Sequence, residues 1–162
     1  MSVPTNRLRR HFITRLQQFL HKNLEGLIDD QVERHLLSRF LVYGDKSRLI
    51  IADTAIVNNA LFNLISGWII VEDYVFFGHN VSILTGTHDY HKLGIQRQTS
   101  APDSGHDIII KCGAWLASNV TVVGPCVIGE HSVVAACSLV NSNVPPYSIV
   151  AGIPARPIGS VQ

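Results

Sequence analysis

The chain has 162 residues, a length that suits one domain with a small appendage. Its 13 Lys and Arg residues oppose 12 Asp and Glu residues, so the chain as a whole lacks the positive field of a nucleic-acid-binding protein. Only 15% of the residues are charged and 46% are hydrophobic, which requires that much of the chain be buried.

The uncharged stretches of the chain do not have the character of membrane spans. Residues 112–129 and 131–155 carry no Asp, Glu, Lys or Arg, but Pro and Asn interrupt both of them. Residues 1–15 lack the apolar run and cleavage site of a signal peptide, so we expect a cytoplasmic protein. An odd number of cysteines without a CxxC favours reduced thiols at Cys112, Cys126 and Cys137.

The first 28 residues have the apolar spacing of a helix. Apolar side chains recur there at three- and four-residue steps: Leu8, Phe12, Leu16, Leu20, Leu24 and Ile28. This spacing predicts a helix from about Thr5 to Ile28. A second, shorter helix is expected over Val32 to Leu41, closed by Gly44. We therefore expect a helical cap over residues 1–44 and a second domain over residues 45–162.

The basic residues of the first segment all precede its first acid, Glu25. They are Arg7, Arg9, Arg10, Arg15 and Lys22. A solvated helix face is the ordinary interpretation of such a run, and a weak contact with a membrane surface or a partner is the alternative.

From about Leu49 onward, apolar residues recur at steps of six. They form three runs: Ile51 and Val57; Ile65, Val71, Phe77 and Ile83; and Ile110, Leu116, Val122, Ile128, Val134 and Val140. A small or branched residue usually follows four positions later. One large and one small residue in every six suit a short strand with its large side chain inward, followed by a tight corner.

Three such units close a triangular coil of about 18 residues, and stacked coils form a solenoid around a ladder of repeated residues. The sequence predicts about four coils, over residues 49–67, 71–88, 110–127 and 128–145. The step between Val57 and Ile65 is eight, so two extra residues are expected to bulge within 58–63.

The repeat is interrupted between Ile83 and Ile110, where the step is 27. The inserted segment, about 89–107, is polar and contains Gly94 and Gly105. It is too long for a corner, and long excursions from a regular fold are usually functional.

Three segments around the repeats resemble those of a known family. They are Leu84–Asp89 (LTGTHD), Ile110–Ser118 (IKCGAWLAS) and Val144–Pro157 (VPPYSIVAGIPARP). In this succession the sequence resembles the hexapeptide-repeat acyltransferases, in the sugar O-acetyltransferase branch of the maltose and galactoside acetyltransferases and of surface-polysaccharide synthesis. The resemblance covers about residues 51–158. It implies an all-β solenoid, a left-handed parallel β-helix; the hand rests on the resemblance alone, because crossovers are generally right-handed.

The resemblance implies an acetyl-CoA-dependent O-acetyltransferase with a histidine as general base, and the matching residue is His88. An imidazole can take the proton of a sugar hydroxyl as its oxygen attacks a thioester. Asp89 either fixes the tautomer of that ring or begins a turn. His91 is the alternative base and, with Asn63, an expected contact to the acceptor; Asn58 is the alternative to Asn63.

In the family, acetyl-CoA lies in a groove between adjacent subunits, so the resemblance implies a homotrimer with its active sites between copies. The matching cofactor positions are Trp115, Ser118 and Ala136 along the pantetheine arm and Arg156 toward the phosphates. Trp115 is expected to point outward, where a Trp suits a ligand or an interface.

One position departs from the family. Asn141 and Ser142 stand where the family commonly has a lysine that grips phosphate, and Lys111 or Arg156 is the expected substitute. Because of this departure, a non-catalytic scaffold remains an alternative function. N-acetylation of an amino-sugar nucleotide is the alternative among the enzymatic functions. A zinc enzyme of this architecture requires two histidines five residues apart. No two of the eight histidines have that spacing, so we expect no metal. The resemblance implies a sugar or glycan acceptor as the partner.

Overall fold

The computed structural model describes residues 12–22 and 39–161. The chain divides into two units, residues 1–38 and 39–162, and each is described by itself. Residues 12–22 are helical, within the helix predicted from Thr5 to Ile28. The other residues of that helix, and residues 32–38 of the second predicted helix, lie outside the described residues.

The end of the second predicted helix is a strand. Strand β1 (Leu41–Tyr43) pairs in parallel with β3 (Leu61–Asn63). Val42 packs against the core while Leu41 and Tyr43 are exposed, which is the two-residue alternation of a strand. The prediction of a helix through Leu41 is wrong because pairing with β3 outweighs the helical spacing of so short a segment.

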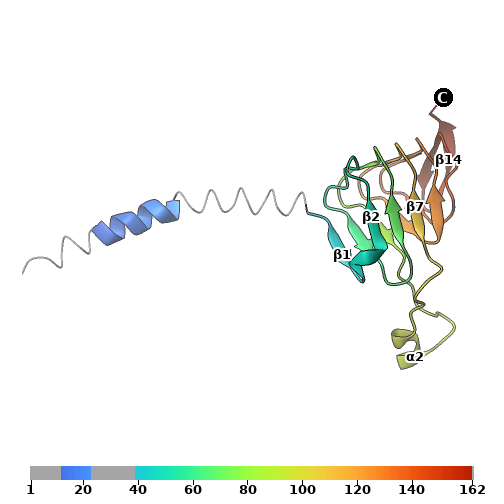
Figure 1. Cartoon of the computed structure of the whole chain (residues 1–162), viewed down its shortest axis with the longest axis horizontal. Coiled ribbons are helices and arrows are strands. Elements are labelled where there is room, and N and C mark those ends of the chain that lie inside the picture. Colours follow the sequence, from blue (N-terminus) through green and yellow to red (C-terminus); the bar gives the residue numbers. More distant parts are fainter. Residues whose placement is uncertain (1–11, 23–38, 162) are drawn as a thin grey trace, which may run out of the picture. The chain divides into compact units, whose positions relative to one another are not determined.

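The second unit is a coil with three faces, because the chain visits three sheets in turn and lays one strand on each (Figure 1). Sheet A contains β1, β3, β6 (Ser82–Leu84), β9 (Thr121–Val123) and β12 (Leu139–Val140). Sheet B contains β2 (Leu49–Ile51), β4 (Ile69–Val71), β7 (Ile108–Ile110) and β10 (Cys126–Ile128). Sheet C contains β5 (Phe76–Phe77), β8 (Trp115–Leu116), β11 (Val133–Val134), β13 (Ser148–Gly152) and β14 (Ala155–Ser160).

The core is the ladder of inward residues that the six-residue spacing predicts. In sheet C the parallel register sets Phe77, Leu116 and Val134 in one column, and all three are buried. Burying such a side chain stabilises the fold by about 1.5–3 kcal/mol. The predicted positions from Val71 to Val140 are all buried in the same way.

The first coil differs from the predicted ladder. Phe62, and not Ile65, pairs with Ile83 in sheet A and is fully buried, whereas Ile65 is half-buried at a corner. The prediction of a bulge within 58–63 is also wrong, because the extra residues follow β3. Strand pairing decides the register here, since Phe62 also places its ring 6.3 Å from that of Phe77 inside the coil.

The corners between sheets C and A use residues that accept a left-handed backbone. Asn58, Asn80, Asn119 and Cys137 occupy this place in successive coils with φ between 44 and 61°. Asn adopts such values more readily than most residues. The amide of Asn80 also bridges two coils, accepting a hydrogen bond from Asn59 at 2.7 Å and donating one to Asn119 at 3.4 Å.

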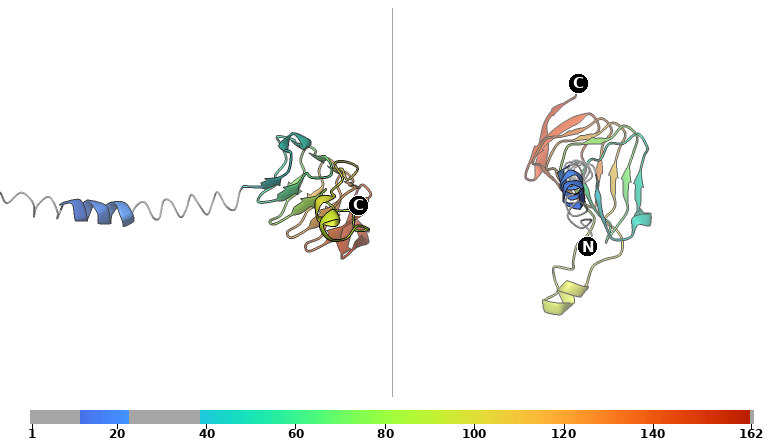
Figure 2. Two further views of the ribbon diagram at one scale, coloured as in Figure 1. Left: turned by 90° about the horizontal axis from the view of Figure 1, so that it is seen from below. Right: turned by 90° about the vertical axis from the view of Figure 1, so that its left-hand side faces the viewer.

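The excursion projects from the coil between β6 and β7 (Figures 1 and 2). It contains one short helix, α2 (Gly94–Thr99), which the polar sequence did not predict. Arg97 fastens this helix to the incoming chain by donating to the carbonyl oxygens of Lys92 at 2.6 Å and Tyr90 at 3.2 Å. The excursion therefore has a definite backbone conformation.

The last strands form a hairpin that the repeat did not predict. β13 continues sheet C, and β14 turns back to pair with it in antiparallel fashion. A 3-10 turn, Lys46–Arg48, precedes β2 at the other end of the coil. Within residues 12–22 and 39–161, no helix has the length and apolar character needed to cross a membrane.

Candidate active site

The segment that carries His88 is fastened to the preceding coil. After β6, buried Thr85 donates from its hydroxyl to the carbonyl oxygen of Asn63 at 2.7 Å and from its amide to the same oxygen at 3.0 Å. The Thr85 hydroxyl in turn accepts from the amide of Ser66 at 3.2 Å. Three hydrogen bonds therefore fix the backbone just before His88.

Gly86 is required by the side chain opposite it. A Cβ on Gly86 would stand 2.5 Å from Oδ1 and 2.7 Å from Nδ2 of Asn63. The same Oδ1 accepts from the amide of Ile65 at 3.1 Å, so the Asn63 side chain is held in place. The expected acceptor residue Asn63 thus lies against the expected base segment.

His88 is exposed at the start of the excursion. The carboxylate of Asp89 accepts from the amide of His91 at 3.1 Å and lies 3.7 Å from Nζ of Lys92. Asp89 was expected either to fix the tautomer of His88 or to begin a turn, and these contacts fit the turn. His91 is exposed as well, and its ring lies 4.3 Å from that of Tyr90.

The returning limb of the excursion is anchored to the first coil. Arg48 donates from Nη1 to the carbonyl oxygen of Asp103 at 2.7 Å, 55 residues away in sequence. The amide of His106 donates to Ser66 at 3.1 Å, and Asp107 accepts from the amide of Trp68 at 2.8 Å. Both limbs of the excursion are therefore fixed, and sequence reasoning missed Arg48 because no motif marks an arginine that binds a carbonyl.

The expected cofactor positions lie on sheet C and on the corner that follows it. Trp115 is exposed and stacks on Phe76 with ring centroids 5.6 Å apart and planes at 13°. The register places Ser118 and Ala136 in one column at the corner. A Cβ on Gly78, in the neighbouring column, would stand 2.5 Å from the Ser118 hydroxyl, so the close approach of Ser118 requires a glycine there.

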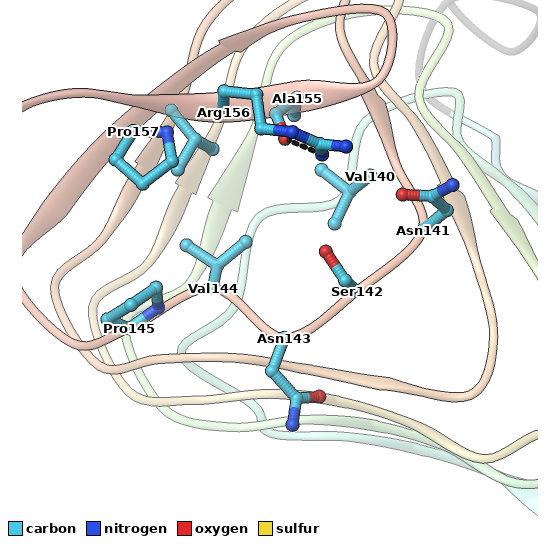
Figure 3. A pocket seen from close by; sticks show the side chains of 10 residues that line it. Val140, Asn141, Ser142, Asn143, Val144, Pro145, Ala155, Arg156 and Pro157 are labelled. Carbon is cyan, nitrogen blue, oxygen red and sulfur yellow. Dashed lines mark hydrogen bonds between the residues drawn. The ribbon is translucent and has the colours of Figure 1, made fainter.

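A cavity of about 320 Å³ lies at the C-terminal end of the coil (Figure 3). Arg156 extends over it and donates to the carbonyl oxygen of Ala155 at 2.8 Å. Asn141 and Ser142 line it where the family has a lysine, and Arg156 is the only charged residue of its lining. The sequence placed Arg156 near the cofactor phosphates but did not indicate a cavity.

Lys111 is not available as a substitute for that lysine. Its ammonium group lies 2.6 Å from a carboxylate oxygen of Glu72, whose other oxygen accepts from the amide of Cys112 at 3.1 Å. Both partners are partly shielded from water, so the pair is worth more than an exposed ion pair. Of the two expected substitutes, only Arg156 lies at the cavity.

Within one chain, the two groups of expected site residues lie on different sides of sheet A. His88, Asp89 and His91 follow β6, where the chain leaves sheet A for sheet B. Trp115 lies on sheet C, and Ser118 lies where the chain enters sheet A from sheet C. The structure brings together Asn63 and the His88 segment, but it does not bring this group to the cofactor positions of the same chain.

Cys126 and Tyr147, which lie away from the excursion, have raised pKa values. Burial raises the pKa of the Cys126 thiol from 9.0 to about 11. A hydrogen bond to Glu130, together with the charge of that carboxylate, raises the pKa of Tyr147. In the part of the chain that the structure describes, no group of three or more His, Cys, Asp and Glu residues could hold a metal ion.

Residues 107–142 match the family model of the bacterial transferase hexapeptide (six repeats). The chain is 32% identical over 94 residues to a putative acetyltransferase of Schizosaccharomyces pombe, covering 58% of this chain and 44% of that protein. It is 33% identical over 101 residues to the galactoside O-acetyltransferase of Escherichia coli, covering 57% of this chain and 48% of that enzyme. The chain thus spans about half the length of these curated relatives.

A solved hexapeptide-repeat acetyltransferase of Vibrio cholerae has the same fold. Its TM-score is 0.64 at 25% identity, with 94% of this chain and 90% of that chain covered. A second structure of that protein, in complex with acetyl coenzyme A, has a TM-score of 0.53 at 24% identity, with 83% and 78% covered. Residues 107–142 thus carry the hexapeptide repeat, and the proteins that the chain resembles include acetyltransferases, galactoside O-acetyltransferases among them.

Proposed function

We propose that the protein transfers the acetyl group of acetyl-CoA to a hydroxyl of a sugar or of a surface-polysaccharide precursor. The observation that carries the proposal is the exposed His88, on a backbone segment that hydrogen bonds fasten at Thr85 before it and at Asp89 after it. A general base must reach a substrate hydroxyl and must be held in place; His88 is exposed to a substrate, and the backbone that carries it is held. The acetyltransferase relatives support the same reaction.

His88 is the proposed general base. It takes the proton of the acceptor hydroxyl as the new ester bond forms and the thioester C–S bond breaks, and it then gives that proton to the departing sulfur. Asn63 and His91 contact the acceptor, since Asn63 lies against Gly86 and His91 follows on the same segment. Asp89 holds the first turn of the excursion and, through it, the backbone of His88.

Acetyl-CoA is proposed to lie along the column of Ser118 and Ala136, where small side chains let a thin chain approach the backbone. Trp115 borders this column, and Arg156 offers a positive charge at the cavity near its end. A guanidinium group suits phosphate through charge and paired donors. A single cation there, without the lysine that the family commonly has, predicts modest affinity for the phosphates.

The coil is proposed to wind left-handed and to assemble as a homotrimer with its active sites between copies. Two observations support this assembly. His88 and the cofactor column lie on different sides of sheet A, so a neighbouring copy is needed to bring them together. The outward row Ile56, Phe76 and Trp115 on sheet C is 59%, 42% and 41% exposed, which leaves an apolar surface for that neighbour.

The test is to mix the purified protein with acetyl-CoA and a panel of mono- and oligosaccharides and to follow the release of free thiol. We expect thiol release with certain sugars only, and products that lose the acetyl group in mild alkali, as an ester does. Products stable to alkali would instead indicate N-acetylation of an amino sugar. If no sugar releases thiol and CoA does not raise the melting temperature, the protein is a scaffold and the proposal is wrong.

A further inference from the structure

The helix over residues 12–22 has an apolar stripe that none of the site residues uses. Phe12, Leu16 and Leu20 follow one another at four-residue steps and therefore lie on one face. Their exposed fractions are 68%, 45% and 43%. Ile13 and Phe19 widen the same stripe and are also exposed. The helix thus presents a surface that suits an apolar contact.

The polar residues around this stripe have one sign of charge. Residues 1–24 hold five of the 13 basic residues of the chain and none of its 12 acidic residues. The remaining residues therefore hold eight basic and 12 acidic residues, so their formal charge is −4 while that of residues 1–24 is +5. Within the helix, Arg15 and Lys22 carry this charge. An amphipathic helix with a cationic polar face is typical of segments that lie on a membrane surface.

A second copy of the helix is a poor partner for this stripe. Two such helices would bring Arg15 and Lys22 of each copy together with no acidic residue between Met1 and Leu24 to oppose them. Charge therefore disfavours helix pairing.

We propose that residues 12–22 bind an anionic phospholipid bilayer, with the helix lying in the plane of the interface. Phe12, Leu16 and Leu20 enter the boundary between headgroups and acyl chains, and Arg15 and Lys22 meet the lipid phosphates. Because the polar face of the helix is cationic, the binding depends on the lipid charge. The inference uses no residue of the proposed active site, and it stands or falls separately from the proposed function.

The test uses the full-length chain and sedimentation with vesicles. One set of vesicles is phosphatidylcholine alone, and the other contains about 30% phosphatidylglycerol, an anionic lipid. We expect binding to the anionic set, weakening as salt is raised, and little binding to the neutral set. Each cation near an anionic surface changes the partition coefficient about fivefold. Lys22→Gln should therefore weaken binding about fivefold, and the matched change Lys46→Gln, in the coil unit, should leave it unchanged.

A second pair of variants tests the apolar stripe. Leu16→Ala keeps a strong helix former and removes apolar carbons, so we expect about a tenfold loss of vesicle binding. The neighbouring polar-face change Gln17→Ala should have no effect. Equal binding by all variants, or binding to neither vesicle set, would overturn the proposal. The proposal would also fail if Leu16→Ala bound vesicles like the native chain but had a different subunit stoichiometry, because a second copy would then cover the stripe. A lower melting temperature of the coil in this variant, with unchanged vesicle binding, would show that the coil itself covers the stripe.

Discussion

The side chain of Asn63 fills the space that a Cβ on Gly86 would need, with Oδ1 2.5 Å from that position. This contact joins β3 of the first coil to the segment that carries His88 two residues later. The carbonyl oxygen of Asn63 also accepts two hydrogen bonds from Thr85. A glycine facing an asparagine therefore sets the backbone on which the proposed base is mounted.

Gly86→Ala should reduce acetyl transfer more than it reduces stability. The new methyl group forces Asn63 to move, and a displacement of about 1 Å near reacting groups can cost on the order of a hundredfold in rate. We expect kcat to fall by roughly tenfold to a hundredfold, measured as initial rates of thiol release at saturating acetyl-CoA.

Gly159→Ala is the matched control for this change. Gly159 lies in β14, and the nearest atom to an added Cβ there is 3.9 Å away, an ordinary contact. Its activity and melting temperature should equal those of the native chain. If Gly86→Ala is as active as Gly159→Ala, the contact with Asn63 does not position the His88 segment.

Arg48→Ala should loosen the excursion without unfolding the coil. A hydrogen bond from a charged donor is worth about 1.5–3 kcal/mol, so losing the bond to Asp103 should raise the population of the open excursion about tenfold or more. Limited proteolysis within residues 89–107 should speed up accordingly, and the KM for the sugar should rise more than kcat falls.

Lys46→Ala serves as the control, because this exposed lysine lies on the same 3-10 turn and removes one positive charge as well. It should leave both the cleavage rate and the KM unchanged. Equal cleavage rates for Arg48→Ala and the native chain would show that the excursion is held without Arg48.

The free energy of unfolding should fall in alkali because of the buried Cys126 thiol. Burial raises the pKa of its thiol to about 11 in the folded chain, above the 9.0 of an exposed thiol. The unfolded state therefore loses this proton first, and the stabilisation, present below about pH 9, is lost as the pH rises toward 11. A shift of this size corresponds to about 2–3 kcal/mol at most.

The measurement is urea unfolding of the native chain and of Cys126→Ala between pH 8 and pH 11, within the range set by that pKa. The stability difference between the two should shrink as the pH rises. Cys137→Ala, at an exposed cysteine, is the control for the loss of a thiol group. A difference for Cys126→Ala that does not change with pH would contradict the raised pKa.

Mixed oligomers should test whether the active site is shared between copies. His88→Ala removes the proposed base, and Ala136→Trp fills the small-residue column proposed for the pantetheine arm. Each variant alone should be inactive. Oligomers refolded from a mixture should regain activity, because one copy supplies His88 and its neighbour supplies Ala136.

A mixture that forms mixed oligomers, seen by mass spectrometry, and yet remains inactive would show that each site lies within one chain. Refolding the double variant His88→Ala/Ala136→Trp with His88→Ala is the control. No copy in that mixture carries His88, so no activity should return.

The six-residue spacing predicted the buried ladder from Val71 to Val140, because the inward positions repeat regularly on both sides of the excursion. It failed at Ile65, since the step changes in the first coil and the pairing of Phe62 with Ile83 decides the register. It also missed β1 and α2, which are too short for a periodic pattern.

The candidate site, too, could be predicted only in part from the sequence. The resemblance selected His88, Trp115, Ser118 and Arg156, and the roles of these residues remain predictions. The contacts that position them, such as Arg48 with Asp103 and Asn63 with Gly86, join residues far apart in sequence and have no local signature. They become visible only when the coils are stacked.

The most direct test of the account compares His88→Ala with His91→Ala in thiol release from acetyl-CoA with an accepted sugar. A general base contributes about 10²–10⁴-fold, so we expect kcat of His88→Ala to fall by that factor, with the oligomer and the heat protection by CoA unchanged. His91→Ala should retain most of its kcat and raise the KM for the sugar. Native turnover by His88→Ala, or a loss of that size in His91→Ala alone, would contradict the proposed role of His88.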